Sequence, residues 1–297
     1  MEHFDVLIVG AGISGIGAAC HLRAQCPSRT YLILEGRDDI GGTWDLFRYP
    51  GVRSDSDMQT LGYQFKPWTA AKAIADGPSI LQYLRDTCTE HGVDQRIRLG
   101  HLVRKAEWSS DDARWTVTAE RKGTGEMVGF TCGYLFMGSG YYSYQGGYVP
   151  DFPGRERFQG QVVHPQDWPD GLDYAGKRVV VIGSGATAVT LVPALAQTAG
   201  QVTMLQRSPT YVWAMPDTDV IANALRKVLP ERIAYRITRW KNTTLQQLLY
   251  WRARNAPEKM KAWLIGLVRR ALGPDYDVAT HFTPKYHPWD QRLCLVP

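Results

Sequence analysis

Two glycine-rich segments carry the spacing that binds the pyrophosphate of a dinucleotide. The first reads Gly10-x-Gly12-x-x-Gly15, and Glu35 lies 20 residues beyond its last glycine. Glycines at these positions permit a tight turn, a close approach of the backbone to pyrophosphate and close packing of a helix on a strand. A carboxylate at that distance can accept hydrogen bonds from ribose hydroxyls. The first segment therefore predicts an FAD-type site.

The second segment reads Gly183-x-Gly185-x-x-Ala188, and it differs from the first in the residue that follows it. Arg207 lies 24 positions after Gly183, where the first segment has a carboxylate at the matching distance. A guanidinium suits a 2′-phosphate, whereas a carboxylate suits a free ribose diol. We therefore predict an NADPH-type site, with a surface arginine at a strand end as the alternative interpretation.

Each glycine segment lies between elements that can position it. Residues 6–9 form an apolar run before the first segment and residues 179–182 before the second, and each segment continues into a helix of small residues. A second apolar strand follows in both cases. Between the two segments, HLVRKAEW, RWTVTAE and GYLFMGSG alternate like the strands of a β-meander.

Composition narrows the class of protein. The chain has 297 residues, 44% of them hydrophobic and 21% charged, which is typical of a soluble globular protein with room for two domains. Five scattered cysteines contain no Cys-x-x-Cys, which argues against a disulfide framework, a zinc site or a dithiol redox centre. The seven histidines form no metal-binding pair, so we predict no metal. The apolar start at about residue 4 leaves no room for a signal peptide, and we expect a cytoplasmic protein.

Positive charge is concentrated in one segment. Residues 221–272 contain twelve Lys or Arg and two acids, a net charge of +10, while the whole chain carries +5. Several Tyr and Trp residues accompany this charge. The segment fits either a pair of solvated amphipathic helices or a peripheral membrane contact. No recognition motif accompanies it, so nucleic acid is not an expected partner.

Two further motifs carry a family resemblance. GGTWDLFRYPGVRSDSD covers residues 41–57, and FQGQVVHPQDWP covers residues 158–169. Together they resemble the Baeyer–Villiger monooxygenases, whose fingerprint F-x-G-x-x-x-H-x-x-x-W-P is matched at every defined position. The matching residues are Phe158, Gly160, His164, Trp168 and Pro169.

The resemblance implies an α/β fold with two Rossmann-like dinucleotide-binding domains, the NADP domain being inserted into the FAD domain, and a small helical subdomain. It assigns residues 1–150 to the first part of the FAD domain and 151–178 to a linker with the fingerprint. Residues 179–297 become the NADP-binding domain, with a helical insertion at about 217–280. The family architecture requires a further C-terminal part of the flavin domain, so a truncated chain is expected.

The resemblance also assigns cofactor contacts. FAD is expected at Gly10, Gly12, Ser14, Gly15, Glu35, Thr43, Trp44, Asp45, Leu46 and the main chain near Val103. NADPH is expected at Gly183, Ser184, Gly185, Ala186, Thr187, Ala188, Val189, Arg207 and Ser208. Arg53, Ser54 and Asp55 are expected near both cofactors.

The family reaction needs a fixed positive charge. NADPH reduces FAD, the reduced flavin adds O₂, and the resulting peroxyflavin attacks a carbonyl carbon or a soft heteroatom such as sulfur. Arginine suits an anionic intermediate because it stays protonated. The resemblance assigns this role to Arg292 and the pairing carboxylate to Asp55, because the offset from Tyr49-Pro50-Gly51 favours Asp55 over Asp57. A turn-forming or capping role is the alternative for either acid. Gln291 stands where the family has a lysine for the 2′-phosphate, which leaves more of that contact to Arg207 and Ser208.

His164 is expected to act through conformation rather than chemistry. Pro165 and Pro169 flank the segment and restrict its backbone, which suits a joint between domains better than a mobile base. We interpret His164 as a linker residue that couples NADPH binding to domain position.

These predictions lead to one function and two alternatives. The leading hypothesis is an FAD- and NADPH-dependent monooxygenase that inserts one oxygen atom from O₂ into ketones or adds it to the sulfur of thioamides or sulfides. A flavin-containing N- or S-monooxygenase without ester-forming activity is the second. An inactive truncated fragment that binds its cofactors poorly is the third. The missing dithiol disfavours a flavin disulfide reductase.

Overall fold

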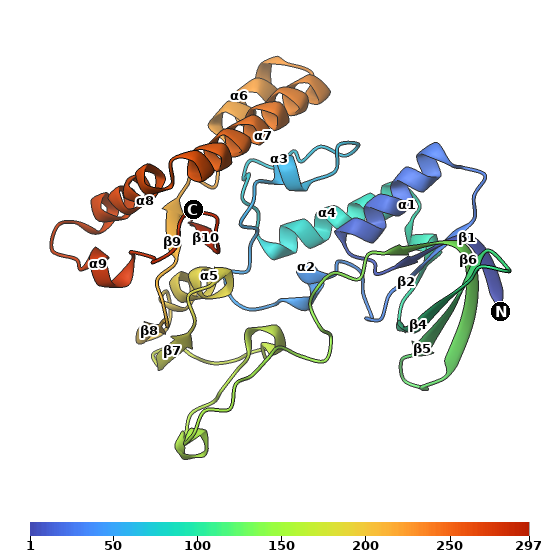
Figure 1. The fold of residues 1–297 in the computed structure, drawn as a ribbon, viewed down its shortest axis with the longest axis horizontal. Coiled ribbons are helices and arrows are strands. Elements are labelled where there is room, and N and C mark those ends of the chain that lie inside the picture. The colour runs from blue at the N-terminus through green and yellow to red at the C-terminus, as the bar shows by residue number, and fades with distance from the viewer. Residues whose placement is uncertain (297) are drawn as a thin grey trace. The chain divides into compact units, whose positions relative to one another are not determined.

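The computed structural model describes residues 1–296, which form two compact units (Figure 1). Unit 1 comprises Met1–Arg48 and Gly77–Trp168. Unit 2 comprises Tyr49–Asp76 and the described residues from Pro169 onward. The chain therefore leaves unit 1 after Arg48 and returns to it at Gly77.

A six-stranded sheet forms the centre of unit 1, in the order β3-β2-β1-β6-β5-β4. The neighbours from β3 to β6 pair in parallel, whereas β6, β5 and β4 pair antiparallel as the predicted meander. The strands are β1 (Glu2–Val9), β2 (Tyr31–Leu34), β3 (Ile97–Arg98), β4 (His101–Ser109), β5 (Arg114–Arg121) and β6 (Met127–Met137).

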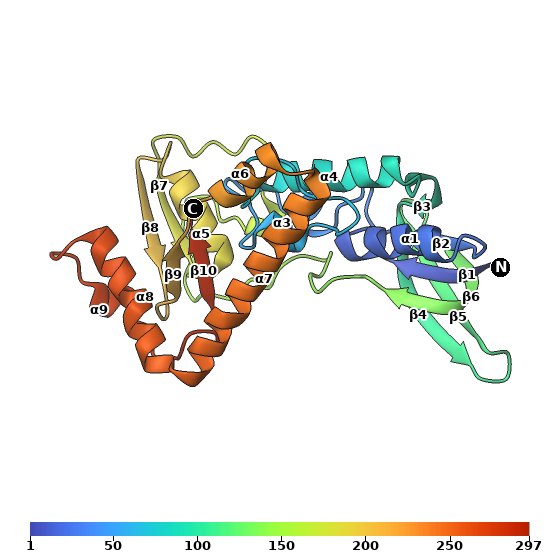
Figure 2. The same cartoon turned by 90° about the horizontal axis from the view of Figure 1, so that it is seen from above.

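Helices cover this sheet and connect its parallel strands. α1 packs against β1 and β2 (Figure 2), and α4 packs against α1 and α2. The helices of unit 1 are α1 (Ile13–Gln25), α2 (Thr43–Leu46) and α4 (Gly77–Glu90), with short 3-10 turns η1 (Asp94–Arg96), η2 (Arg155–Arg157) and η3 (Pro165–Asp167).

The strand register brings the chemical residues of unit 1 to one edge. Val9 pairs with Leu34 on one side and with Met137 on the other, so the carboxyl ends of β1, β2 and β6 meet. Leu7, Leu34 and Phe130, each at most 1% exposed, belong to the core below this edge. Polar groups that follow these strands must therefore converge above a rigid apolar base.

Unit 2 contains two small parallel sheets. β7 (Arg178–Ile182) pairs with β8 (Gln201–Leu205), and α5 (Ala186–Leu195) connects them in the predicted strand–helix–strand order. β9 (Tyr211–Ala214) pairs with β10 (Leu293–Val296), although 78 residues separate them. α5 packs against β7, β8 and β10 and so joins the two sheets.

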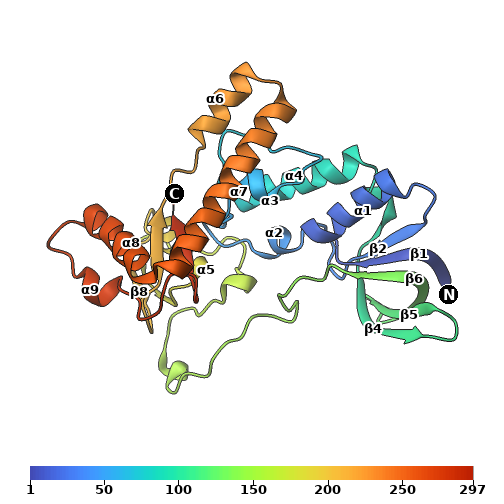
Figure 3. The ribbon, with the colours of Figure 1, turned by 45° about the horizontal axis from the view of Figure 1, so that its top comes forward.

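Helices make up most of the rest of unit 2. α6 and α7 run side by side and α3 packs against α7 (Figure 3), while α8 packs against β9. A fully buried cluster lies where α8 packs against β9, and it consists of Tyr211, Ala253, Met260 and Leu264. The helices are α3 (Met58–Leu61), α6 (Val220–Val228), α7 (Glu231–Asn255), α8 (Pro257–Leu272) and α9 (Val278–His281).

The predicted fold class is confirmed: the chain is α/β with a Rossmann-like parallel sheet. The division into an FAD domain, a linker and an NADP domain stays a prediction. In the structure, residues 49–76 pack within unit 2. No helix within residues 1–296 is long and apolar enough to cross a membrane.

Candidate dinucleotide-binding sites

The first glycine segment forms a tight turn at the carboxyl end of β1. Gly10 has φ +95°, and a Cβ on it would lie 2.6 Å from the carbonyl oxygen of Gly138. A Cβ on Gly15 would lie 1.9 Å from the carbonyl oxygen of Gly10, so α1 packs directly on the turn. Neither position can carry a side chain without moving backbone.

Gly12 leaves the start of α1 open to a ligand. It is the N-cap of α1, its backbone is extended, and no side chain caps the helix. The first backbone N–H groups of a helix lack internal partners, which makes this end suited to a phosphate anion. Gly42, with φ +56°, lies against Gly12, so a second glycine turn forms the facing wall.

Glu35 is buried beside this turn. Glu35 is only 1% exposed. One carboxylate oxygen accepts a hydrogen bond from the backbone N–H of Ala11 at 2.7 Å, and the other accepts from that of Arg37 at 2.9 Å. Each oxygen retains a lone pair, so the carboxylate is oriented and can still accept from a ribose hydroxyl.

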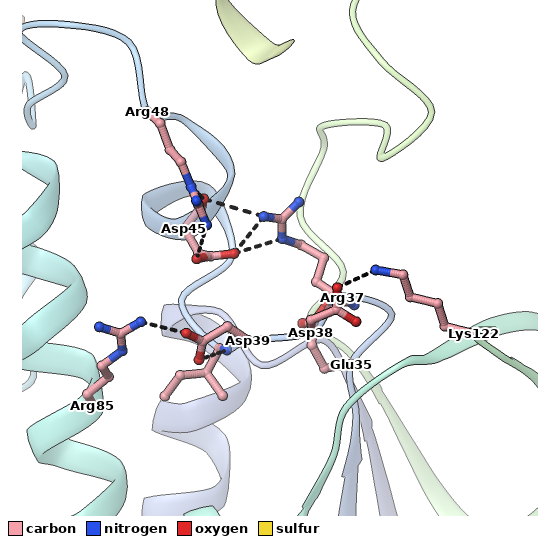
Figure 4. Close-up of polar contacts among 9 residues, drawn as sticks. Glu35, Arg37, Asp38, Asp39, Asp45, Arg48, Arg85 and Lys122 are labelled. Carbon is pink, nitrogen blue, oxygen red and sulfur yellow. Dashed lines mark hydrogen bonds and ion pairs between the residues drawn. The ribbon is translucent and has the colours of Figure 1, made fainter. Parts of the chain in front are cut away.

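Asp45 anchors the facing wall rather than lying free in the site (Figure 4). Arg37 donates to one carboxylate oxygen of Asp45 at 2.6 and 3.1 Å, and Arg48 pairs with the other at 3.3 Å. Asp45 is 4% exposed, and breaking a buried pair on one side leaves an uncompensated charge. These ion pairs therefore hold α2 in place beside the glycine turn.

Two more ion pairs brace the loop after β2. Asp39 pairs with Arg85 of α4 at 2.5 Å, and Asp38 pairs with Lys122 (Figure 4). All four side chains are partly exposed, so each pair contributes little stability by itself. Together they fix where the loop between Glu35 and α2 runs.

The turns enclose a pocket of about 80 Å³. That volume is smaller than the roughly 300–1,000 Å³ of most ligand pockets. This cradle has a size that suits the pyrophosphate portion of a dinucleotide and not the whole molecule. Of the residues predicted to contact FAD, the pocket is lined by Gly10, Gly12, Ser14, Thr43, Trp44 and Leu46.

The remaining predicted FAD residues lie beside the pocket or away from it. Gly15 shapes the turn from below, and Glu35 and Asp45 have the hydrogen bonds described above. Val103 packs against the core of the sheet, next to an irregularity in the pairing of β4 with β5. The residues around the pocket fit a bound FAD. The side chain of Val103 does not line the pocket.

Three tyrosines of the loop after β6 line the pocket and were missed from the sequence. They are Tyr141, Tyr142 and Tyr144. The Arg37 guanidinium lies 5.5 Å from the centre of the Tyr144 ring, and partial burial and the nearby charge of Glu35 raise the pKa of Tyr144 to about 12. The parallel pairing of β6 with β1 could have predicted this, because it brings the end of GYLFMGSG beside the glycine turn.

The fingerprint segment braces this tyrosine loop within unit 1. The ring of His164 accepts a hydrogen bond from the N–H of Gln166 at 3.2 Å and so caps η3. Gln166 is 8% exposed and donates from its side chain to the carbonyl of Ser143 at 2.6 Å. A Cβ on Gly147 would lie 1.9 Å from the His164 ring. His164 therefore has a positioning geometry, and Gln166 is its unpredicted partner.

The other fingerprint residues do not converge with His164. Phe158 is 61% exposed, and its ring lies over Gly160, where a Cβ would come within 2.5 Å of it. Trp168 is the last residue of unit 1, and Pro169 is the first of the following segment of unit 2.

The second glycine segment repeats the turn in unit 2. Gly183 has φ +134° and donates its N–H to the carbonyl of Leu205 at 2.8 Å. Gly185 is the N-cap of α5, again with no side chain over the helix start. The first turn of that helix contains four predicted NADPH residues: Ala186, Thr187, Ala188 and Val189.

The strand end beside this turn carries the predicted phosphate contacts. Ser184 is buried and donates its hydroxyl to the carbonyl of Ser208 at 3.0 Å, which ties the turn to the end of β8. Arg207 is exposed and forms no ion pair within residues 1–296. A free guanidinium here is available to a 2′-phosphate.

Arg292 and Asp55 both lie in unit 2, and Arg292 lies near the second glycine turn. A guanidinium nitrogen of Arg292 lies 3.6 Å from the position of a Cβ on Gly185. Burial raises the pKa of the Cys294 thiol, with the charge of Asp55 adding to it and those of Arg292 and Arg53 opposing it. The thiol therefore lies among all three charges, although 236 residues of sequence separate Asp55 from Arg292.

The segment that carries Asp55 is held by α5. Thr190 donates to the Tyr49 hydroxyl at 3.4 Å, and a Cβ on Gly51 would lie 2.6 Å from the Thr190 carbonyl. Arg53 donates to the carbonyl of Leu295 at 3.2 Å, and burial lowers its pKa. The motif GGTWDLFRYPGVRSDSD thus contributes its first half to unit 1 and its second half to unit 2.

Asp57 has the capping role that was its alternative interpretation. It is the N-cap of α3 and accepts from the N–H of Thr60 at 3.0 Å. Ser54 is also structural, since it is 3% exposed and bonds to the carbonyl of Ser56 at 2.7 Å. Asp55 and Gln291, by contrast, are exposed.

Comparison with known proteins gives matches along the whole chain. The flavin-binding monooxygenase-like family matches residues 75–266, and the NAD(P)-binding Rossmann-like domain matches residues 8–76. The FAD-containing monooxygenase EthA of Mycobacterium tuberculosis is 55% identical over 297 residues, covering 100% of this chain and 60% of EthA. The chain thus spans about 60% of the length of the curated relatives it matches.

Solved structures give the same picture. Oxidized steroid monooxygenase bound to NADP matches with a TM-score of 0.80 and 27% identity, covering 99% of this chain and 62% of that one. Cyclohexanone monooxygenase from Rhodococcus sp. Phi1 bound to NADP+ matches with a TM-score of 0.64 and 29% identity, covering 76% and 43%.

Proposed function

The chain belongs to the flavin-binding monooxygenase-like family, and on that premise we propose that it acts as an FAD- and NADPH-dependent monooxygenase. The resemblance to Baeyer–Villiger monooxygenases is confirmed at the family level. The proposed reaction inserts one atom of O₂ into a ketone or adds it to the sulfur of a thioamide or sulfide. NADPH supplies the two electrons, and the second oxygen atom leaves as water.

One observation carries the proposal: two glycine turns at uncapped helix starts lie in one chain, one beside a buried carboxylate and the other followed by an exposed arginine. Glu35 is oriented to accept from a diol, and Arg207 is free to bind a phosphate. FAD and NADPH differ in this way. Two identical cofactors would not need opposite charges at matching positions.

The protein residues have binding and electrostatic tasks. FAD, when bound, supplies the redox and oxygen chemistry. The N–H groups at the start of α1 would hold its pyrophosphate, and Glu35 would hold its ribose hydroxyls. Arg292 would present a permanent positive charge to oxygen anions formed during the reaction, and Asp55 would balance and orient that charge.

Substrate class separates the two enzymatic alternatives. Purified chain is supplied with FAD, NADPH and either cyclohexanone or thiobenzamide, and products are identified by mass spectrometry. Lactone from cyclohexanone supports ketone insertion. S-oxide without any lactone supports the flavin-containing N- or S-monooxygenase instead, and NADPH oxidation without either product contradicts both.

Arg292 provides the matched test within this assay. Replacing it with Gln should lower product formation about 100-fold, the usual loss when a donor to a developing oxyanion is removed. Arg269→Gln removes an exposed arginine of α8 and should leave the rate unchanged. Equal rates for the two variants would remove Arg292 from the proposal.

Cofactor binding is tested separately from turnover. A flavin absorption spectrum of the purified chain, followed by titration with FAD, measures what the first cradle holds by itself. A chain that binds no FAD would support the inactive fragment. A peripheral membrane contact of the basic helices and a cytoplasmic location also remain proposals for this chain.

A further inference from the structure

Helix α7 has an apolar stripe on the side that faces water. The stripe consists of Ile233, Ile237, Trp240, Leu248 and Trp251, which are 48%, 41%, 69%, 59% and 64% exposed. At 3.6 residues per turn, their spacing confines them to an arc of about 80° that runs about 27 Å along the helix. Thr244 lies on the same arc between Trp240 and Leu248 and divides the stripe into two apolar groups. Exposed apolar side chains gathered on one solvent face of a helix mark an interaction surface.

The same helix is already packed on its other side. Ala234, Thr238, Asn242 and Ala253 are buried, and they follow the opposite arc. Their contacts join α7 to α3 and to the cluster around Tyr211. The stripe is therefore not the core face of α7, and its apolar residues are not used by the fold of unit 2.

Uncompensated positive charge borders the stripe. Arg236 lies on one side of it and Arg252 on the other, both exposed and without an ion pair within residues 1–296. Two other cations of the helix are engaged: Lys241 pairs with Asp219 at 2.7 Å and Arg254 with Asp290 at 2.5 Å. The one acid of α7 is Glu231 at its first position.

We propose that this stripe binds the surface of a lipid bilayer that contains anionic lipids, with α7 lying in the plane of the interface. Trp and Ile side chains would enter the boundary between headgroups and acyl chains, and Arg236 and Arg252 would extend toward lipid phosphates. The inference is independent of the proposed oxygenation, because it uses no residue of either dinucleotide site.

Charge decides between this occupant and a second copy of the chain. A two-fold contact through the stripe would bring the arginines of one copy toward those of the other, with no acid on the stripe to balance them. A membrane surface offers phosphate anions along the whole length of the helix and an apolar layer below them. Residues 221–272, with a net charge of +10, add attraction to the same anionic surface.

The test measures sedimentation of the purified full chain with vesicles of phosphatidylcholine alone or mixed with phosphatidylglycerol, at low and high salt. We expect binding to the mixed vesicles to exceed binding to the neutral ones by at least about 10-fold and to fall with salt. The double variant Trp240→Gln/Trp251→Gln should lose at least about 10-fold, because both apolar anchors are gone. Arg236→Gln/Arg252→Gln should lose about 5-fold for each arginine.

Two control variants make the same kinds of substitution at positions outside the stripe and its border. Leu245→Gln changes a residue that is 48% exposed on α7 but off the stripe, and Arg269→Gln/Arg270→Gln removes two exposed charges from α8. Leu245→Gln should bind mixed vesicles within about twofold of the parent chain, and the α8 variant should lose clearly less than Arg236→Gln/Arg252→Gln, since neither change touches the stripe or its border. Circular dichroism of each variant establishes that the fold is retained.

Four results would overturn the proposal. Equal binding to neutral and mixed vesicles would remove the role of anionic lipid. A loss from the α8 variant as large as that from Arg236→Gln/Arg252→Gln would reduce the surface to overall charge. Self-association without lipid that Trp240→Gln/Trp251→Gln abolishes would make the stripe an interface between copies, and binding to neither vesicle would point to a protein partner with an acidic groove.

Discussion

The side-chain amide of Asn242 in α7 donates a hydrogen bond to a carboxylate oxygen of Asp57 at 2.9 Å. Gln246, one turn later, donates to the other oxygen at 3.0 Å. Asp57 also caps α3, so one carboxylate joins two helices two residues after Asp55. The helical part of unit 2 thereby holds the loop that carries the predicted catalytic carboxylate.

Asp57→Ala should destabilise unit 2 by about 1–3 kcal/mol, because the helix cap and two hydrogen bonds are lost together. Chemical denaturation measures this. Asp55→Ala is the matched control: Asp55 is exposed, so its loss should change stability by less than about 0.5 kcal/mol. Equal destabilisation by both would mean that Asp55 also has a structural role.

Two alanine substitutions in the first glycine turn should have different effects. Gly15→Ala should unfold or strongly destabilise unit 1, because its Cβ would lie 1.9 Å from the Gly10 carbonyl oxygen. Gly12→Ala meets only Gly42, at 3.6 Å, so the fold should remain while the methyl group narrows the cradle. Thermal melting and FAD titration separate the two. Tight FAD binding by Gly12→Ala would argue against a pyrophosphate at this turn.

Arg207→Gln should weaken NADPH binding by about 10-fold and leave NADH binding unchanged. The removed guanidinium would pair with the 2′-phosphate, which NADH lacks. Titration with both nucleotides gives the ratio, and Arg178→Gln, an exposed arginine at the start of β7, is the control. Parallel weakening of both nucleotides would contradict the assignment.

Gln166→Leu should weaken FAD binding by about 5- to 10-fold, because the tyrosine loop loses its hydrogen bond to the Ser143 carbonyl. His164→Ala should have a similar but smaller effect, through loss of the cap that orients Gln166. Gln159→Leu, on an exposed glutamine of the same segment, should bind FAD normally. If only His164→Ala affected binding, a direct role for the imidazole would replace the bracing role.

Stability of unit 2 should fall in acid through Asp219. Burial raises the pKa of this carboxyl, but hydrogen bonds from Lys241 and the N–H of Ala222 outweigh burial, so the folded pKa lies below the unfolded value of 3.8. Its contribution is therefore present above pH 3.8 and is lost as pH falls through the folded pKa. Asp219→Asn should flatten the acid side of the stability curve. An unchanged acid slope would contradict the sign of this shift.

The sequence by itself determined both glycine turns, their strands and helices, and the opposite charges of Glu35 and Arg207. These are local features, because strand, turn and helix follow one another within about 30 residues. A turn that requires positive φ is also indicated directly in the sequence by the glycine that it needs. Alternating apolar and polar residues in HLVRKAEW and the two segments after it were also enough to predict the strands of the meander. Side chains point to opposite faces in turn along a half-buried strand, so the sequence alternates in the same way.

Only the tertiary structure decided which distant groups meet. Tyr144 lies close enough to Glu35 for that charge to raise its pKa, and Arg37 and Arg48 pair with different oxygens of Asp45. Arg292 approaches Gly185 although more than 100 residues separate them in sequence. Local residue patterns carry no record of such contacts, because they depend on strand order and helix packing. The apolar stripe of α7 belongs to the same class: its spacing is readable in the sequence, but only packing showed which face of the helix the fold leaves exposed to water.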